Sequence, residues 1–320
     1  MQIISGITDF QLNSPSAVAI GKFDGVHLGH RMLIEDIVRY SEEHDGVKSV
    51  VFTFNPSPES FFAGQSFPEL TTVSEKRHIF ERMGVDVLIE FPMDQDTVHT
   101  SPKEFISVYL VTKMKAAYIA AGSDISFGDK GLGNADTIRE GGIKFGYESN
   151  IHDKITYNGE DISSTRIREA VESGDMITAS AMLGSPYRVT GTVSHGRHLG
   201  HRLGMPTANL IIPPDKITGP KGVYYSKVYT GTGVYASISN VGIKPTISES
   251  GSSEWSLNVC EELLCCESYI YDFDSDIYGD YIEVELLEFI RPEMKFDSID
   301  ELKAQMERDI ESGKKYHHLF

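Results

Sequence analysis

Apolar residues in the first half of the chain follow two alternating patterns. Short, continuous apolar runs of strand length lie at 16–21, 49–54, 85–91 and 116–122. Between these runs the apolar residues recur every three or four positions, as on one face of a helix, at 31–44, 74–83 and 102–114. Strands that alternate with helices predict an α/β domain built on a parallel sheet with crossover helices.

Polar residues mark the start of the third of these helices. Ser101 stands at the N-cap, Pro102 at the first helical position and Glu104 three residues after the cap, which predicts a capping box. Two more helical stretches follow, at 164–172 and 176–183.

After residue 184 the pattern changes to strand-like runs separated by turn residues. These runs lie at 187–193, 222–229, 233–239, 256–261, 267–273 and 281–290. Such a series without helices predicts a small antiparallel barrel or sandwich. One helix closes the chain from Ser298, where Ser298 and Glu301 predict a second capping box. We therefore expect two domains, 1–184 and 185–320.

Composition and charge narrow the class of protein. The 320 residues carry a formal net charge of −18 with a pI of about 5.0, so the surface as a whole repels nucleic acid and anionic membranes. Cys260, Cys265 and Cys266 lack metal-ligand spacing, which indicates reduced thiols. The chain has no signal-like N-terminus and no apolar stretch of membrane-spanning length. We expect a soluble, cytoplasmic protein without nucleic-acid or membrane partners.

The stretch "GKFDGVHLGHRML" at 21–33 has the clearest chemical pattern. It joins the first predicted strand to a helix expected to begin near Arg31, so it lies at the carboxyl end of a parallel strand, where ligands bind in open sheets. A helix N-terminus offers free N–H groups and the positive end of a dipole. His27 and His30, three apart, are expected to share one face of the first turn and to donate to a polyphosphate. The structural alternative is a glycine-rich turn with incidental histidines.

The spacing His27-Leu28-Gly29-His30 is similar to the HxGH signature of the nucleotidyltransferase superfamily. The longer stretch resembles the adenylyltransferase module of bacterial bifunctional riboflavin kinase/FAD synthetases, and "ISSTRIR" at 162–168 resembles the same family's ISSTxIR segment. The resemblance implies a Rossmann-like domain in which His27 and His30 are catalytic. It further implies nucleotide or phosphate contacts by Gly21, Phe23, Asp24, Gly25, Gly29, Ser164, Thr165 and Arg168. It implies flavin contacts by Asp124 and Phe127.

The second half resembles the riboflavin kinase module of that family in four stretches. These are "HGRHLGHRLGMPTANL" (195–210), "SNVGIKPTI" (239–247), "ESYIYDFDSDIYG" (267–279) and "FIRPEMKF" (289–296). The resemblance implies an antiparallel β-barrel with a C-terminal helix, in which Gly196 and Gly204 belong to a phosphate-binding loop. It implies that Thr207 and Asn209 help to hold Mg²⁺ and that Glu267 is the catalytic base. Taken singly, Pro-Thr-Ala-Asn is also a plausible turn and Glu267 a plausible solvated side chain.

Several positions depart from the family pattern. Ser57 stands where a histidine is usual, the "SDISFG" segment lacks a phenylalanine and an arginine, and His201 and Lys244 each replace an arginine. The segment before Glu267 is long, so Glu261 and Glu262 are rival assignments for the base.

The expected function is flavin cofactor synthesis: riboflavin and ATP give FMN, and FMN and a second ATP give FAD. ATP is the co-substrate and Mg²⁺ the implied metal. Two alternatives remain open because of the departures. One is an enzyme that keeps only one of the activities, and the other is a non-catalytic flavin- or nucleotide-binding regulator.

Overall fold

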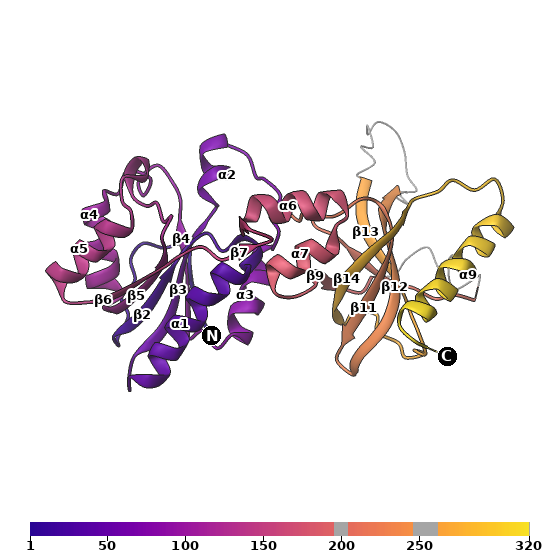
Figure 1. The fold of residues 1–320 in the computed structure, drawn as a ribbon, viewed down its shortest axis with the longest axis horizontal. Helices are drawn as coiled ribbons and strands as arrows, with labels where there is room; N and C mark the ends of the chain where they lie inside the picture. The colour runs from indigo at the N-terminus through magenta and orange to yellow at the C-terminus, as the bar shows by residue number, and fades with distance from the viewer. Residues whose placement is uncertain (195–203, 246–261, 320) are drawn as a thin grey trace, which may run out of the picture. The chain divides into compact units, whose positions relative to one another are not determined.

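The computed structural model describes residues 1–194, 204–245 and 262–319. Contacts between main-chain positions divide the chain into two compact units, Met1–Ser164 and Thr165–Phe320, and we describe each by itself (Figure 1). The boundary between the two expected activities, 184/185, stays a prediction.

A six-stranded, wholly parallel sheet is the centre of the first unit. Its strands lie in the order β1-β4-β3-β2-β5-β6. Their bounds are β1 Gln2–Ser5, β2 Ser16–Ile20, β3 Lys48–Asn55, β4 Val87–Pro92, β5 Ala116–Gly122 and β6 Glu148–His152. The predicted parallel sheet is thus confirmed. The two edge strands, β1 and β6, were missed because they are short and β6 ("ESNIH") is largely polar.

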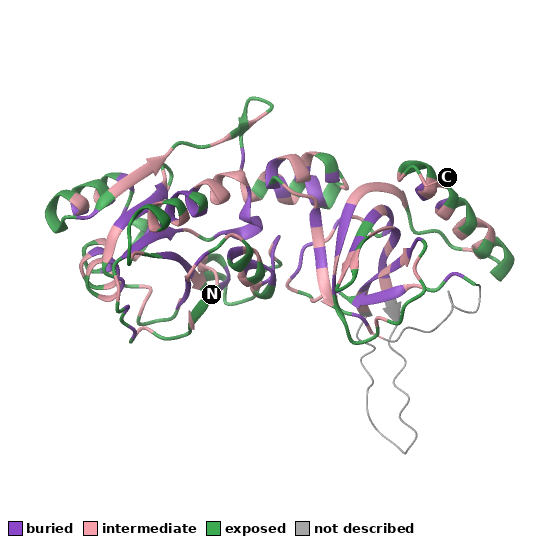
Figure 2. Ribbon diagram, turned by 90° about the horizontal axis from the view of Figure 1, so that it is seen from below, coloured by how far each residue is buried: buried purple, intermediate pink, exposed green. Residues whose placement is uncertain are grey.

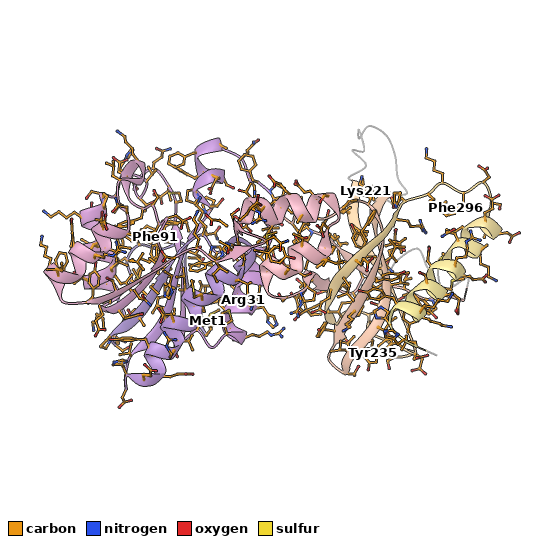
Figure 3. The ribbon with its side chains drawn as sticks, viewed as in Figure 1. Met1, Arg31, Phe91, Lys221, Tyr235 and Phe296 are labelled. Carbon is orange, nitrogen blue, oxygen red and sulfur yellow. The ribbon has the colours of Figure 1, made fainter. Side chains whose placement is uncertain are left out.

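Helices cover both faces of this sheet. They are α1 Leu28–Glu43, α2 Pro58–Ala63, α3 Val73–Arg82, α4 Pro102–Glu104, continued by a π-helical segment Phe105–Lys113, and α5 Ala135–Phe145. Single 3₁₀ turns occupy Asp24–Val26 and Asp129–Gly131, and β7 (Thr156–Tyr157) pairs with β8 (Glu160–Asp161). Two apolar cores result, one on each face; Phe91, labelled in Figure 3, belongs to one of them.

An antiparallel sheet of six strands forms the second unit, in the order β10-β13-β12-β11-β14-β9. Its bounds are β9 Tyr187–Thr192, β10 Ala208–Ile211, β11 Gly222–Thr230, β12 Gly233–Pro245, β13 Glu262–Ile270 and β14 Tyr281–Pro292. The N–H of Ser194, just after β9, donates to the carbonyl of Asn209 in β10 at 2.9 Å, which joins the two edges. The predicted small antiparallel barrel is therefore confirmed. The strand expected at 256–261 lies outside the described residues.

In the described part of the second unit, the barrel is accompanied by the helices α6 Ser164–Ser173, α7 Met176–Leu183 and α9 Ile299–Tyr316. Helix α7 packs against β9 and β14, whereas α9 packs against β11 and β12. In both units the buried residues concentrate on the strands (Figure 2).

Both predicted capping boxes form the N-cap hydrogen bond. The side chains of Ser101 and Ser298 accept from the N–H groups of Glu104 and Glu301, at 3.2 Å each. The carboxylate of Glu301, however, accepts from the N–H of Asp297, one residue before the cap, rather than from Ser298.

Candidate active sites

The strand order of the first unit places a switch point beside β2. From β2 the chain moves outward to one side through β3 and β4, and then to the other side through β5 and β6. Ligands of open α/β sheets bind at such a switch point, outside the carboxyl ends of the strands. Residues 21–27 follow β2 directly and therefore lie there.

The loop after β2 has an unusual backbone. Phe23, Gly25 and Val26 have φ values of 55°, 79° and 42°, in the left-handed region. A β-branched residue is rarely found there, so Val26 is strained, and such strain concentrates at functional sites. The Phe23 ring is fully buried and packs edge-on against Phe80, with 5.6 Å between ring centroids.

Asp24 holds this loop to the segment before α3. Its carboxylate accepts from the N–H groups of Leu70 and Thr71 at 2.8 and 3.3 Å, and the N–H of Gly25 donates to Thr71 Oγ1 at 3.0 Å. The Asp24 carbonyl accepts from Ser164 Oγ at 3.0 Å. The described contacts of Asp24 and Ser164 thus build the loop, and their contacts with a nucleotide remain a prediction.

His27 and His30 form a stacked pair at the start of α1. The helix begins at Leu28, earlier than predicted, because His27 is its N-cap and accepts the N–H of His30 on Nδ1 at 3.4 Å. The ring centroids are 3.7 Å apart with 19° between the planes. Gly29 allows this arrangement, since a Cβ there would lie 3.2 Å from the His27 ring. Gly21 similarly lies against the Phe23 ring, 3.2 Å from where its own Cβ would be.

Burial keeps both histidines uncharged at neutral pH. Loss of solvation lowers the pKa of His27 to about 4, against the opposing charges of Asp24 and Asp124. The pKa of His30 is also well below its usual value, chiefly through burial and further through His27 and Lys76. Among the described residues His30 Nδ1 is buried without a hydrogen-bond partner. Neutral imidazoles each keep one N–H donor, which suits an anionic group at a helix N-terminus.

The other predicted residues of this site differ in placement. Asp124 follows β5 at the same edge of the sheet, is exposed, and pairs with Lys154 at 3.2 Å. Phe127 is only 4% exposed and packs in the core against Phe105, so a contact with flavin stays a prediction. Thr165 and Arg168 belong to α6 in the other unit, and their approach to His27 likewise stays a prediction. Ser57, at a departure position, is the N-cap of α2.

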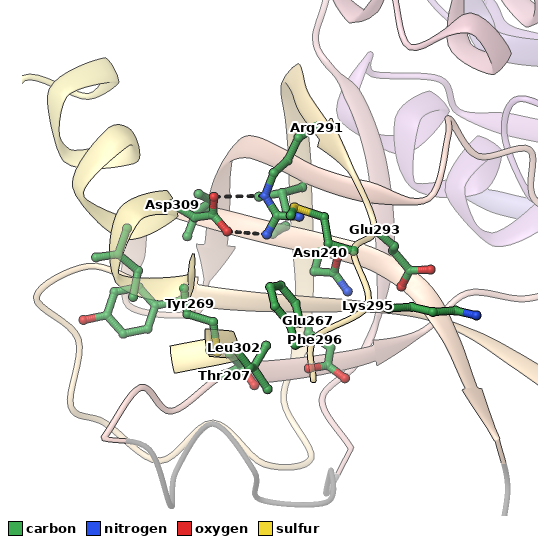
Figure 4. Close-up of a pocket in the computed structure, with 16 residues that line it drawn as sticks. Thr207, Asn240, Glu267, Tyr269, Arg291, Glu293, Lys295, Phe296, Leu302 and Asp309 are labelled. Carbon is green, nitrogen blue, oxygen red and sulfur yellow. Dashed lines mark hydrogen bonds and ion pairs between the residues drawn. The ribbon is translucent and has the colours of Figure 1, made fainter. Parts of the chain in front are cut away.

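The second unit contains a cavity of about 520 Å³ between α9 and the outer face of the barrel (Figure 4). Strand residues line one wall: Val223, Ile238, Ser239, Asn240, Glu267, Tyr269 and Arg291. Helix and loop residues line the other: Thr207, Glu293, Met294, Lys295, Phe296, Leu302, Met306, Asp309 and Ile310.

Strand register places the predicted kinase residues together. Glu267 in β13 is the cross-strand partner of Asn209 in β10 and of Asn240 in β12. Directly opposite residues share a face of a sheet, so the carboxylate lies between two amides. Thr207 precedes β10 and lines the same cavity, and its carbonyl accepts from the Asn209 side-chain amide at 3.1 Å.

Several residues that the resemblance singled out lie outside the described part of the chain. Gly204 has a φ of 78° in the turn before β10, whereas Gly196, His201 and Glu261 lie outside the described residues. For Glu262 and Lys244 only the strand position is described.

Sequence reasoning missed most of the cavity wall. The residues of α9 follow helical spacing at Leu302, Met306 and Ile310, which predicts an apolar face but does not say what it covers. Arg291 and Asn240 lie within recognised stretches, yet nothing in the sequence marked them as cavity residues.

Within the described ranges no group of three or more His, Cys, Asp or Glu side chains is arranged to hold a metal ion. No helix among these residues is long and apolar enough to span a membrane. Cys265 and Cys266 are both buried, and burial raises the pKa of the Cys266 thiol to about 11.

Comparisons with known proteins agree with this two-part arrangement. The FAD synthetase family model matches residues 9–166, and the riboflavin kinase model matches 183–317. A bifunctional riboflavin kinase/FMN adenylyltransferase of Haemophilus influenzae is 34% identical over 99% of both chains. The Bacillus subtilis protein of the same description is 33% identical over 94% of this chain and 92% of its own.

Among solved structures, a crystal structure described as a macrolide-efflux protein from Streptococcus pneumoniae is 30% identical. It covers 98% of each chain with a TM-score of 0.80. Both matched domains are transferase domains of flavin cofactor synthesis that use ATP as co-substrate. The chain belongs to the bifunctional riboflavin kinase/FMN adenylyltransferase family.

Proposed function

We propose that the first unit adenylylates FMN to FAD at the switch point beside β2, and that the second unit phosphorylates riboflavin to FMN in the cavity under α9. The observation that carries the proposal is the stacked, neutral His27/His30 pair at the N-terminus of α1, placed at the switch point of the sheet.

In adenylyl transfer a phosphate oxygen of FMN attacks the α-phosphorus of ATP, and pyrophosphate leaves. Negative charge grows on the phosphate oxygens during the attack. The imidazole N–H groups of His27 and His30, with the N–H groups of the first turn of α1, are placed to donate to those oxygens. Because both rings are buried, little solvent reorganisation accompanies the reaction. Gly29 keeps space for the His27 ring.

In the kinase step the ribityl 5′-hydroxyl attacks the γ-phosphorus of ATP, and ADP leaves. Glu267 takes the hydroxyl proton as that bond forms, since it lies in the cavity beside Thr207. The hydroxyl of Thr207 and the amide oxygen of Asn209 are hard, neutral donors next to a carboxylate, and such donors fit Mg²⁺ bound together with ATP phosphates. When bound, Mg²⁺ neutralises charge on the phosphates.

The apolar part of the cavity suits the isoalloxazine ring system. Ile238, Tyr269, Met306 and Ile310 line it, and 520 Å³ lies within the range of small-molecule sites. We further propose that the protein acts in the cytoplasm on these small molecules and not on nucleic acid or a membrane, since a net charge of −18 repels anionic surfaces.

One experiment tests the proposal against its alternatives. The protein is incubated with riboflavin, ATP and Mg²⁺, and the flavins are separated after timed intervals. Both FMN and FAD are expected. FMN alone, or FAD only when FMN is supplied, would indicate that one activity has been lost. Flavin binding without either product would indicate a regulator.

A further inference from the structure

Helix α9 is attached to the barrel over only part of its length. The hydroxyls of Tyr271 and Tyr225 bond to the Ile310 carbonyl and to Ser312 Oγ at 2.7 and 2.6 Å, and the Tyr316 ring stacks on Tyr225 with 4.0 Å between centroids. In contrast, within the described residues every side-chain hydrogen bond and ion pair made by 299–308 stays on α9 or on the segment just before it.

The first attachment met along α9 is an ion pair in the cavity wall. Arg291 at the end of β14 contacts Asp309 through two parallel hydrogen bonds, Nε to Oδ1 at 3.1 Å and Nη2 to Oδ2 at 2.5 Å (Figure 4). Asp309 is only 8% exposed, and Gln305 donates a further hydrogen bond to its Oδ1 at 2.8 Å. Arg291 Nη1 also donates to the Pro292 carbonyl at 2.9 Å, which fixes the guanidinium plane.

Among the described residues, α9 has no hydrogen-bonded or ionic side-chain attachment to the barrel on the N-terminal side of the ion pair between Arg291 and Asp309, where its first turns line the cavity. Met306 and Leu302 lie about one and two helical turns before Asp309, and both line the cavity. At a rise of about 1.5 Å per residue, Leu302 is roughly 10 Å along the helix from Asp309, so a tilt of roughly 10° at the ion pair moves Leu302 by about 2 Å. A displacement of that size changes the width of a site meant for a flat ring.

We propose that Arg291 and Asp309 are positioning residues for the kinase reaction: their ion pair sets the distance between the first turns of α9 and the barrel, and thereby the affinity for riboflavin. This inference rests on the proposed function of the cavity. Because neither Thr207 nor Glu267 belongs to α9, the pair governs flavin binding and leaves phosphoryl transfer nearly unchanged.

The test separates binding from turnover in the full-length protein. Asp309→Asn and Arg291→Gln are compared with wild type for kcat, for KM of riboflavin and of ATP, and for the riboflavin Kd measured by quenching of flavin fluorescence. We expect Kd and KM for riboflavin to rise about tenfold, a factor typical of coupled neighbouring residues. The KM for ATP and kcat should change less than about twofold. Glu311→Gln is the matched control, since its carboxylate pairs with Lys314 on the same helix and holds nothing to the barrel.

The double variant distinguishes positioning from direct contact. If the two residues act through their pair, Arg291→Gln/Asp309→Asn weakens riboflavin binding no more than either single change. Additive losses would mean that Arg291 contacts the substrate on its own, and would overturn the inference. An unchanged riboflavin Kd, or a loss confined to kcat, would also overturn it.

Folding and function are controlled separately. Circular dichroism verifies the fold of each variant. If Asp309→Asn does not fold, Gln305→Ala removes the supporting hydrogen bond to Asp309, together with the bonds that Gln305 accepts from Arg308 on the same helix, and should also raise the riboflavin Kd. A wild-type protein that neither binds riboflavin nor makes FMN would refute the proposed function itself. A wild-type kinase whose Gln305→Ala and Asp309→Asn forms bind normally would refute this inference alone.

Discussion

His27 combines a structural and a chemical role in one side chain. As N-cap it accepts the N–H of His30, and as a buried imidazole it lies at the proposed site of adenylyl transfer. His27→Asn separates the two roles, because Asn is an excellent N-cap but lacks the ring. We expect His27→Asn and His30→Ala each to lower FAD formation by about 10²-fold, the effect of losing one transition-state donor.

FMN formation from riboflavin is the internal control for these variants. It should be nearly unchanged, since the residues that line the cavity proposed for the kinase reaction belong to the other unit. Loss of both activities in His27→Asn would show that the ring is needed for folding rather than for adenylyl transfer.

Burial of His27 also has a consequence for stability against pH. The unfolded residue titrates near 6.5 and the folded one at about 4, so between these values the unfolded chain binds more protons. Folding stability should therefore fall as the pH drops from 6.5 towards 4, by up to about 3 kcal/mol from this residue. His27→Asn should show a smaller decrease, measured as the free energy of unfolding at several pH values. Equal decreases in both proteins would contradict the buried, neutral imidazole.

Glu267 is the residue on which the proposed kinase mechanism depends. Glu267→Gln preserves shape but removes the base, so FMN formation should fall by roughly 10²- to 10⁴-fold. FAD formation from supplied FMN should persist. The same assay on Glu261→Gln and Glu262→Gln tests the register: a larger loss in either of these would move the base to that position, and no loss in any of the three would exclude a general base here.

At the scale of residues, the sequence predicts the position of a side chain when its contacts are with residues nearby in the chain or when it belongs to a short motif. The short motifs suggested that His27 lies beside His30, and that Thr207 and Glu267 share a site, and the structure brings each pair together. The catalytic and metal-binding roles of these residues stay predictions. Arg291 was not assigned, because its partner lies on a helix and their meeting depends on the packing of α9. The core position of Phe127 was not foreseen either, since a motif does not state which way a side chain points.

At the scale of elements, the first turn of α1 joins the loop to the histidines. Gly29 is in that turn, and a Cβ there would lie 3.2 Å from Cε1 of His27, so the ring must shift by a few tenths of an ångström. Ala is a better helix former than Gly by up to about 1 kcal/mol. Gly29→Ala should therefore keep or raise the melting temperature while FAD formation falls several-fold, towards about tenfold.

Unchanged FAD formation in Gly29→Ala would show that the exact ring position of His27 is unimportant. The kinase activity of the same variant again serves as the control. A fall in both activities with a lower melting temperature would instead place the effect on folding.

The ends of helices and strands depend on interactions that cannot be predicted from the periodicity of apolar residues. Helix α1 starts at Leu28 because an imidazole replaces the usual capping hydroxyl or carboxylate. The helix expected at 102–114 is present, but from Phe105 to Lys113 it is π-helical, although its apolar pattern alone gave no sign of this. The edge strand β1 is explained by pairing with β4, which is distant in sequence.

At the scale of the whole molecule, the alternation of patterns predicted one parallel and one antiparallel unit correctly. The order of the strands in each sheet could not be predicted from the sequence pattern, because it depends on which edge of the sheet each strand joins. That order matters for function, since it puts the switch point beside β2 and so gives the glycine-rich loop its place.

The division into units leads to a prediction about fragments. The sequence pattern changes from alternating strands and helices to strand-like runs near residue 184. Nevertheless, α6 and α7 pack with the barrel. A Cβ on Gly174, which lies between these helices, would be 3.3 Å from Pro220 Cγ and 3.4 Å from the Phe289 side chain. Met176 and Met182 are each 1% exposed, and Leu183 is 5% exposed. A fragment Thr165–Phe320 should therefore fold and convert riboflavin to FMN. The shorter fragment 187–320 uncovers the barrel surface beneath these helices and should lose several kcal/mol, at about 1.5–3 kcal/mol for each large apolar side chain that loses its cover.

Thermal unfolding and FMN formation of the two fragments, compared with the full-length protein, decide between the boundaries. Lower melting temperature and reduced activity in 187–320 alone would assign α6 and α7 to the kinase unit. Equal stability and activity would instead favour the boundary at 184/185, with the two helices serving the adenylyltransferase. The second result would also fit the segment 162–168, whose Thr165 and Arg168 would then act on the nucleotide bound beside β2.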